Sequence, residues 1–484
     1  MSVSLSSRPT WRPRLGAVLL VALALAGCAS YSGIEPQARA FSPEAAGLAG
    51  ASAPVTASVR PQWWRDFQDP ALDALIERAL ADHPGLVVAQ ARLQRASAAT
   101  GLADAAGGLQ VQGKAEATRQ RYTENGMVPP PLAGSMATTA TLQLGASWEI
   151  DFFGRHAAAL QAALGAERAA QADVEAARVL LAANVARSYV QLARLLELRE
   201  VSARALAQRE ELLGLIRQRV QAGLDTTVEL RQGEGALPET RGQLEALDEQ
   251  IALTRHALAA LTAQPPAALA TLQPRLGTVA EQPLPGSLPV DLLGRRPDVE
   301  AARWRVEAAG RDVAAAKAQF YPNVNLVAFA GLSSIGLDRL LESGSQQYGI
   351  GPAIHLPVFD SRRLRAGLRG KTAELDAAVG SYNSAVIDAV HEVADQLASA
   401  ASVLRQQREQ QAAAAAAESA YDLALQRYRA GLGSYLTVLS AETSVLAQRR
   451  QATDLKARAL DSRIGLMRAL GGGYTAEAAF APHS

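Results

Sequence analysis

Cys28 is the residue whose neighbours most clearly predict covalent chemistry. Three arginines between residues 8 and 14 precede a short apolar run, residues 15–26. A membrane-spanning helix needs about 20 apolar residues, so this shorter run is typical of an export signal. It ends in Leu25-Ala26-Gly27-Cys28, the pattern of a bacterial lipoprotein signal, in which the cysteine is acylated and becomes the mature N-terminus. The alternative is an ordinary signal peptide followed by an incidental thiol.

The residues around Cys28 also predict where the chain is sent. Ala29 rather than Asp follows the cysteine, which by the usual sorting rule of Gram-negative bacteria indicates the outer membrane. Because the sequence contains one cysteine, internal disulfides are excluded. We expect residues 1–27 to be a lipoprotein signal peptide and residues 28–61, rich in Ser, Ala and Pro, to form a lipidated, extended arm.

No other residues form a recognisable catalytic or metal-binding pattern. The six histidines are scattered, and no two are spaced i, i+4. Gly471-Gly472-Gly473 lacks the Lys-Ser/Thr of a phosphate-binding loop, and residues 331–336 have the wrong spacing for a nucleophile elbow. Because 48 Lys and Arg balance 47 Asp and Glu, no net basic field attracts nucleic acid. We therefore expect no enzyme, no cofactor, no metal and no nucleic-acid partner.

Apolar and polar residues alternate in two stretches of the first half of the chain and, more weakly, in two stretches of the second half. Period two over about ten residues fits a transmembrane β-strand with lipid on one face and water on the other. Alternation alone fits a half-exposed strand of a soluble sheet equally well. The four expected strands are residues 109–118, 139–150, 323–332 and 347–356.

The second stretch has the clearest two faces. Its expected lipid-facing residues are Leu142, Leu144, Ala146 and Trp148, and its expected pore-facing residues are Gln143, Gly145, Ser147 and Glu149. Four membrane strands cannot close a barrel, because the unpaired edges would leave backbone groups unsatisfied in hydrocarbon. Since the smallest known barrels use eight strands, several copies of the chain must share one barrel.

The expected helices are long and duplicated. A helix from about residue 156 to about residue 222 would measure roughly 100 Å at 1.5 Å per residue. In each half of the chain such a helix ends in Ala-Gly-Leu, at Gly223 and at Gly431, and a second helix follows. A Pro-rich segment separates the halves. We expect a first repeat at residues 62–264, a crossover at 265–290, a second repeat at 291–473 and a C-terminal tail at 474–484.

Together these motifs resemble the TolC-like outer membrane factors, in particular the lipoprotein (NodT-type) branch that serves tripartite efflux pumps. The similarity covers nearly the whole chain after Cys28. Its motifs are Trp63-Trp64 with Asp69-Pro70, the segment Arg295-Arg296-Pro297-Asp298, the strand entry Phe320-Tyr321-Pro322 and the two Ala-Gly-Leu turns.

The resemblance implies a mainly α fold with a membrane β-barrel. It implies a homotrimer, in which four strands per chain form a 12-stranded outer-membrane barrel that continues as a long periplasmic α-helical barrel, with two pseudo-repeats in each chain. The implied function is an exit duct for drugs or other small toxic compounds. Its implied partners are an inner-membrane transporter of the resistance-nodulation-division (RND) class and a periplasmic adaptor, or membrane fusion protein.

The same resemblance assigns roles to the two turns. The expected adaptor-docking tips are Gly223, Leu224, Gly431 and Leu432, and the expected periplasmic gate residues are Tyr428, Thr437 and Ser440. The sequence departs from the family at Ser440, where an aspartate is common, and at Thr437, which is acidic in some members. The first turn keeps Asp225 and Glu229, but by resemblance it lies on the outside of the closed end. The alternative is that Tyr428 is only a packed seam residue and Ser440 an ordinary helix-surface position.

Two other functions fit the sequence. The same channel fold serves as the outlet of type I protein-secretion systems, although the lipoprotein signal and the Arg-Pro-Asp segment favour efflux. Alternatively, a structural lipoprotein could brace the periplasm with its coiled coils and conduct nothing. The sequence does not identify the exported substrates, because a passive duct has no need of a specific pocket.

Overall fold

The computed structural model describes residues 30–41, 59–277, 296–357 and 359–475. The expected signal peptide, Cys28, residues 42–58 of the expected arm, the second half of the Pro-rich crossover and the end of the tail lie outside the described residues. The chain forms two compact units that share the long helices. The strand unit comprises Met1–Ala40, Gln94–Ala169 and Ala302–Tyr382, and the hairpin unit comprises Phe41–Leu93, Ala170–Ala301 and Asn383–Ser484.

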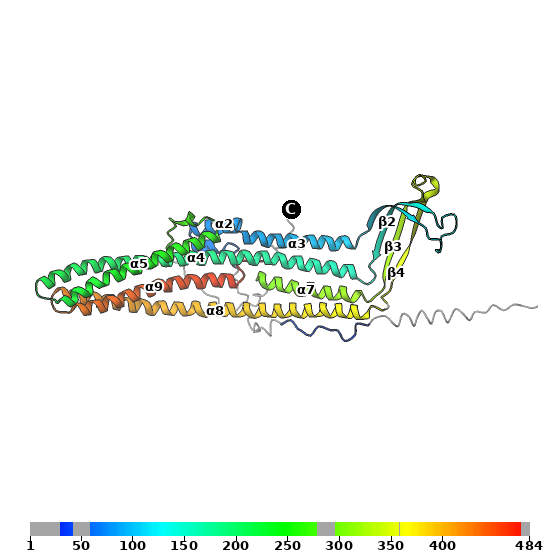
Figure 1. Ribbon diagram of the computed structural model, residues 1–484. Helices are drawn as coiled ribbons and strands as arrows, with labels where there is room; N and C mark the ends of the chain where they lie inside the picture. The colour runs from blue at the N-terminus through cyan, green and yellow to red at the C-terminus, as the bar shows by residue number, and fades with distance from the viewer. Residues whose placement is uncertain (1–29, 42–58, 278–295, 358, 476–484) are drawn as a thin grey trace, which may run out of the picture. The chain divides into compact units, whose positions relative to one another are not determined.

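One succession of elements, helix–strand–strand–long helix–helix, occurs twice (Figure 1). The first copy consists of α3 (Pro84–Ala106), β1 (Gln110–Arg121), β2 (Met136–Ile150), α4 (Arg155–Gln221) and α5 (Thr227–Leu261). The second copy consists of α7 (Pro297–Ala318), β3 (Asn323–Ile335), β4 (Gln346–His355), α8 (Ser361–Arg429) and α9 (Tyr435–Ala469). The shorter elements are η1 (Trp63–Phe67), α2 (Pro70–Asp82), η2 (Pro266–Leu269) and η3 (Ser343–Ser345). The expected internal repeat is confirmed.

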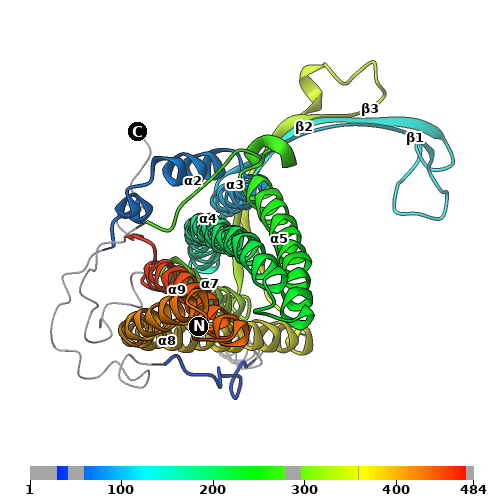
Figure 2. The ribbon, with the colours of Figure 1, turned by 90° about the vertical axis from the view of Figure 1, so that its left-hand side faces the viewer.

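The four strands form one antiparallel sheet in the order β1-β2-β3-β4, which Figure 2 shows as a curved ribbon. The first three strands are longer than the alternation predicted, since β1 continues to Arg121, β2 already begins at Met136 and β3 continues to Ile335. Residues 119–121 are all polar, so the alternation ends there. The backbone pairing nevertheless continues, with Arg119 opposite Thr138 and Arg121 opposite Met136.

Capping groups fix where several helices begin. The Asp69 carboxylate accepts hydrogen bonds from the backbone N–H groups of Ala71 and Leu72, and Pro70 occupies the first helical position of α2. Tyr189 on α4 donates its hydroxyl to the same carboxylate at 2.5 Å. In the hairpin unit, Trp63 and Trp64 are buried in a core with residues of α2, α4, α5 and α9. The tryptophan motif therefore has a structural role.

The two long helices are continuous. Helix α4 has 67 residues and α8 has 69. In the hairpin unit, α5 lies beside α4 and α9 lies beside α8, so two helical hairpins stand side by side (Figures 1 and 2). Within the described ranges, no helix combines the length and the apolar character that crossing a membrane requires.

The N-terminal arm is held firmly along the strand unit. Ile34 is buried with Phe320 of the α7–β3 connection and Leu368 of α8. The Tyr31 ring packs edge-on against the Phe320 ring, with centroids 5.5 Å apart. The Asp376 carboxylate accepts two backbone N–H groups of the arm, each at 2.9 Å. These contacts fix the course of residues 30–38 without a helix or strand.

Candidate functional site

The strand register sorts the side chains of the sheet onto two faces, because residues directly opposite each other in an antiparallel pair share a face. Leu144 lies opposite Gly113 and Ala330, and Ala330 lies opposite Tyr348. The face that contains Leu144, here called the apolar face, includes Val111, Ala115, Ala117, Leu142, Trp148, Val324, Leu326, Leu332, Ile350 and Ile354. The opposite face, here called the polar face, includes Gln112, Lys114, Glu116, Gln143, Ser147, Glu149, Asn325, Ser333, Gln347 and His355.

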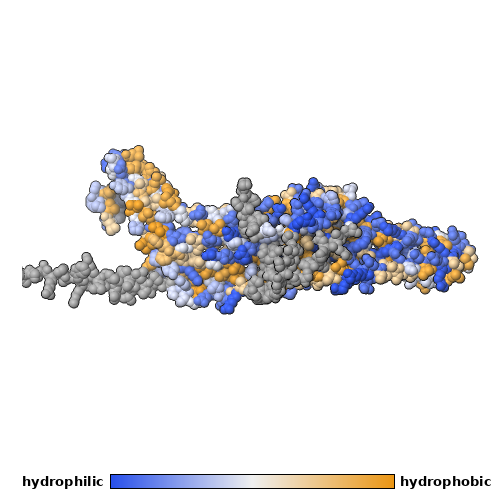
Figure 3. Space-filling model, turned by 180° about the vertical axis from the view of Figure 1, so that it is seen from behind, coloured by the Kyte–Doolittle hydropathy of each residue, from blue (hydrophilic) through white to orange (hydrophobic). Residues whose placement is uncertain are grey.

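The apolar face is exposed in the single chain. Leu142, Leu144 and Trp148 are 48%, 63% and 43% exposed, and no described segment covers them. Figure 3 shows hydrophobic residues gathered on the strand region. A contiguous exposed apolar surface marks a site of interaction with protein or membrane. The residues expected to face lipid thus share one face, and Gln143, Gly145, Ser147 and Glu149 all lie on the other.

The two Ala-Gly-Leu turns have the same geometry. Gly223 and Gly431 have φ angles of +74° and +78°, a conformation that only glycine adopts without strain. The N–H of Leu224 donates to the carbonyl of Arg219 at 2.8 Å, and the N–H of Leu432 donates to that of Arg427 at the same distance. These bonds define two Schellman caps, which end α4 and α8 and leave both leucines exposed.

Tyr428 connects the two turns. Its hydroxyl donates to the carboxylate of Asp225, which follows the first turn. Two guanidinium nitrogens of Arg219 donate hydrogen bonds to the same carboxylate, at 3.0 and 3.1 Å. Its third nitrogen donates to the Tyr428 carbonyl at 3.1 Å. The Arg219 guanidinium also lies 4.5 Å from the centroid of the Tyr428 ring. Tyr428 is fully buried in the single chain.

These contacts set the charge states at the tip. Burial raises the pKa of Asp225, but the hydrogen bonds from Arg219 and Tyr428 outweigh it and hold the pKa below its usual value of 3.8. Burial, reinforced by the neighbouring Asp225 carboxylate, raises the pKa of the Tyr428 phenol. At neutral pH the carboxylate is therefore charged and the phenol is a hydrogen-bond donor.

The other two expected gate residues lie outside this network. Thr437 is exposed, and its backbone N–H and hydroxyl contact Ser434, the N-cap of α9. Ser440 is exposed on the same helix. Sequence reasoning named Asp225 but missed its bond to Tyr428, and it missed Arg219. A difference between the two halves could have drawn attention to this contact. Asp225 and Gly433 occupy equivalent places after the two turns, and only the first of them carries a carboxylate.

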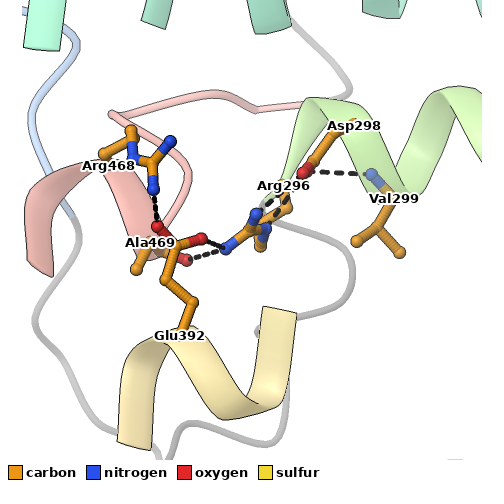
Figure 4. Close-up of polar contacts among 6 residues, drawn as sticks. All are labelled: Arg296, Asp298, Val299, Glu392, Arg468 and Ala469. Carbon is orange, nitrogen blue, oxygen red and sulfur yellow. Dashed lines mark hydrogen bonds and ion pairs between the residues drawn. The ribbon is translucent and has the colours of Figure 1, made fainter. Parts of the chain in front are cut away.

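The Arg-Pro-Asp motif forms a second polar cluster in the hairpin unit (Figure 4). Arg296 binds Asp298 through two nitrogens, at 3.1 and 2.7 Å. A third nitrogen donates to Glu392 of α8 at 2.8 Å and to the carbonyl of Ala469, the last residue of α9, at 3.1 Å. Arg468 donates to the other oxygen of Glu392. The motif therefore fastens the start of α7 to α8 and to the end of α9.

Comparisons with a family model, with related sequences and with solved structures all identify similar outer membrane proteins. The family model described as "Outer membrane efflux protein" matches residues 75–264 and 288–472. The fusaric acid resistance protein FusA of Burkholderia cepacia is 37% identical over 74% of this chain and 69% of its own length. The putative multidrug resistance outer membrane protein MdtQ of Escherichia coli is 33% identical over 85% and 88%. The crystal structure of the outer membrane protein VceC of Vibrio cholerae superimposes with a TM-score of 0.80 at 36% identity, covering 85% of this chain and 99% of that one.

The Arg296 cluster predicts a large difference between two arginine substitutions. The Arg296 side chain is only 9% exposed, so Arg296→Met removes one partner from a buried ion pair. We expect the free energy of unfolding to fall by about 3 kcal/mol, the lower end of the range for such a loss, because Arg468 still pairs with Glu392.

The matched control is Arg311→Met, which breaks a surface pair with Glu307 whose members are both about half exposed. It should cost at most about 1 kcal/mol. Thermal loss of the helical circular-dichroism signal, measured on the purified proteins, compares the two. Equal melting temperatures for both variants would contradict a structural role for the cluster.

Proposed function

Because the chain belongs to the outer membrane efflux protein family, we propose that it is the exit duct of a tripartite efflux pump. Three copies form the channel. It passively conducts drugs or other small toxic compounds that an inner-membrane RND transporter and a periplasmic adaptor deliver to it. The relatives MdtQ and FusA carry names that refer to multidrug and fusaric acid resistance, which supports this class of cargo.

The two-faced sheet is the observation that carries the proposal. Its apolar face contacts lipid through Leu142, Leu144 and Trp148, and its polar face lines the water-filled pore. Strands β1 and β4 are the edges of the sheet in one chain, so each pairs with a neighbouring copy. Three copies of four strands give a closed barrel of twelve.

This orientation predicts that a charged side chain prevents assembly at one position of β2 and is tolerated at the next. Leu144→Arg places a charge on the lipid face, which costs about 2–4 kcal/mol per copy near the bilayer midplane. Gln143→Arg places the same charge in water. We expect the first variant to lose most assembled trimer and the second to retain it. Semi-native gel electrophoresis of outer-membrane fractions measures this, and equal losses in both variants would mean that the sheet does not face lipid.

We further propose that the Arg219–Asp225–Tyr428 network holds the periplasmic end closed. It joins the tip of the first hairpin to the tip of the second within one chain. Opening requires the second hairpin to move away from the first, which breaks these bonds. The low exposure of the three side chains supports the proposal, because Tyr428 is buried and the Arg219 and Asp225 side chains are only 11% and 9% exposed, so water competes little for the bonds in the closed state.

Removing one bond of this network should open the channel. A hydrogen bond to a charged group contributes about 1.5–3 kcal/mol, so Tyr428→Phe should raise the open fraction roughly tenfold or more. Single-channel recording in planar bilayers measures it. Tyr435→Phe is the matched control, because Tyr435 is also buried and its ring lies 6.1 Å from that of Tyr428, yet its hydroxyl is outside the network.

The same recordings test the pH dependence. Asp225 has a lowered pKa, so its contribution to closure is fully present above its usual pKa of 3.8 and is lost only as the pH falls through the lower value in the folded protein. We expect constant conductance between pH 8 and pH 5. Opening within that interval, or equal conductance of Tyr428→Phe and wild type, would contradict the gate. Ser440 carries a separate prediction: a trimer with serine in place of the common aspartate lacks three negative charges at the constriction, so we expect weaker cation selectivity.

The exposed ends of the hairpins support adaptor docking. Leu224 and Leu432 project from the two Schellman turns and are 64% and 70% exposed. Val228 and Leu436, one helical turn further on, are also exposed. Two equivalent apolar patches beside Gly223 and Gly431 thus stand at the tips, where a periplasmic adaptor binds in the proposed assembly.

We also propose that Cys28 carries the lipid anchor. Ser30, two residues later in the sequence, is held by Arg365 of α8, which donates to its carbonyl. The arm therefore ties the anchor to the strand unit. Acylation adds about 0.8 kcal/mol per buried methylene, whereas the barrel buries a whole belt of side chains in the membrane. The anchor is thus an addition to the barrel and does not replace it.

A Cys28→Ser variant, exported with a cleavable signal, should still form trimers and conduct ions. Fractionation, semi-native gels and bilayer recording of the purified variant check this. Wild-type protein labelled with radioactive palmitate is the positive control for acylation. Soluble monomers from the variant would show that the lipid is essential for assembly.

A further inference from the structure

The polar face of the sheet carries one aromatic side chain among several glycines. Within the four described strands, the register places Phe329 on the polar face, whereas Trp148 and Tyr348 lie on the apolar face. Phe329 is 37% exposed in the single chain. The glycines on the polar face of β2, β3 and β4 are Gly145, Gly331, Gly349 and Gly351.

Phe329 lies directly opposite a glycine on both neighbouring strands, Gly145 on β2 and Gly349 on β4. A Cβ atom added to Gly349 would lie 2.7 Å from Cε1 of Phe329, so the ring covers Gly349. A Cβ atom added to Gly145 would have only the Gln112 carbonyl oxygen within reach, at 4.0 Å. The surface over Gly145 is therefore open, and so is the surface over Gly351, where an added Cβ meets nothing within 4 Å.

Polar side chains border this surface on one side. Gln347 donates its amide to the side-chain oxygen of Gln143 at 3.3 Å, across the intervening Gly331. Both glutamines lie one polar-face position along the strands from the Phe329 row. An aromatic ring, the open position over Gly145 and amide groups are thus adjacent on one wall. This combination suits a planar ring that carries polar substituents.

We propose that Phe329 is a stacking subsite for planar aromatic solutes during passage, present once in each copy of the chain. The proposal rests on the proposed function, in which the polar face lines the pore. Stacking of two aromatic rings is weak enough to release a passing molecule and changes its residence by about two- to tenfold. The competing explanation is that the ring only shields the backbone at Gly349.

Phe329→Leu separates the two explanations, because leucine keeps an apolar cover over Gly349 and removes the aromatic face. Tyr348→Leu is the matched control on the opposite face of the sheet. The probe is ethidium, a planar aromatic cation, and tetraethylammonium is the cation without a ring. Current interruptions are recorded on single channels of the full-length protein in planar bilayers, each normalised to the ion conductance of the same channel.

We expect Phe329→Leu to shorten ethidium interruptions about two- to tenfold relative to wild type, and Tyr348→Leu to leave them unchanged. Tetraethylammonium interruptions should be the same in all three proteins. Unchanged ethidium interruptions in Phe329→Leu would overturn the subsite, and so would equal shortening in Tyr348→Leu.

A second measurement separates failure of the subsite from failure of the pore orientation. Phe329→Cys is exposed to a charged, membrane-impermeant thiol reagent while conductance is recorded. Stepwise loss of current shows that position 329 faces the pore, as the subsite requires. If the reagent has no effect, the assignment of the polar face to the pore fails together with the subsite. If current falls but Phe329→Leu behaves as wild type, only the subsite fails.

Discussion

The unpaired backbone edges of β1 and β4 are the constraint on which the rest of the structure depends. One chain supplies four antiparallel strands whose apolar face is exposed, and within the described residues no further strand pairs with the outer edges of β1 and β4. In hydrocarbon each unsatisfied backbone group costs several kcal/mol, so such a sheet is stable only when neighbouring copies complete it. The continuous apolar face, the duplicated helical hairpins and the need for several copies are consistent with this one requirement.

The duplication is not perfect, and the differences between the halves create the chemistry of the tips. Both turns are Schellman caps built on the same Ala-Gly-Leu triplet. The first half places Asp225 after its turn and the second half places Gly433 there, while the second half has Tyr428 where the first has Val220. The carboxylate and the phenol that bind each other thus come from different halves.

Local patterns in the sequence predicted the elements but not their distant contacts. Gly223 and Gly431 predicted the ends of the long helices, because caps and turns depend on neighbouring residues. Alternation located four strands and underestimated β1, since pairing continues through the polar residues 119–121. The Tyr428–Asp225 bond joins residues 203 apart, and no local periodicity encodes such a contact. For the same reason, the sequence did not predict the contacts of Arg296 with Glu392 and Ala469. It also did not predict that Phe329 lies between two glycines, which depends on the register of the paired strands.

Cross-linking of the sheet edges tests the central claim most directly. In a Cys28→Ser background, Ala115→Cys on β1 is combined in turn with Tyr348→Cys, Ile350→Cys or Ile354→Cys on β4, which all belong to the apolar face. Because β1 and β4 are opposite edges of one sheet, a disulfide between them must join different chains. The account predicts that oxidation of at least one pair gives covalent trimers on denaturing gels without reductant. Conducting protein that stays monomeric on such gels for every pair would contradict it.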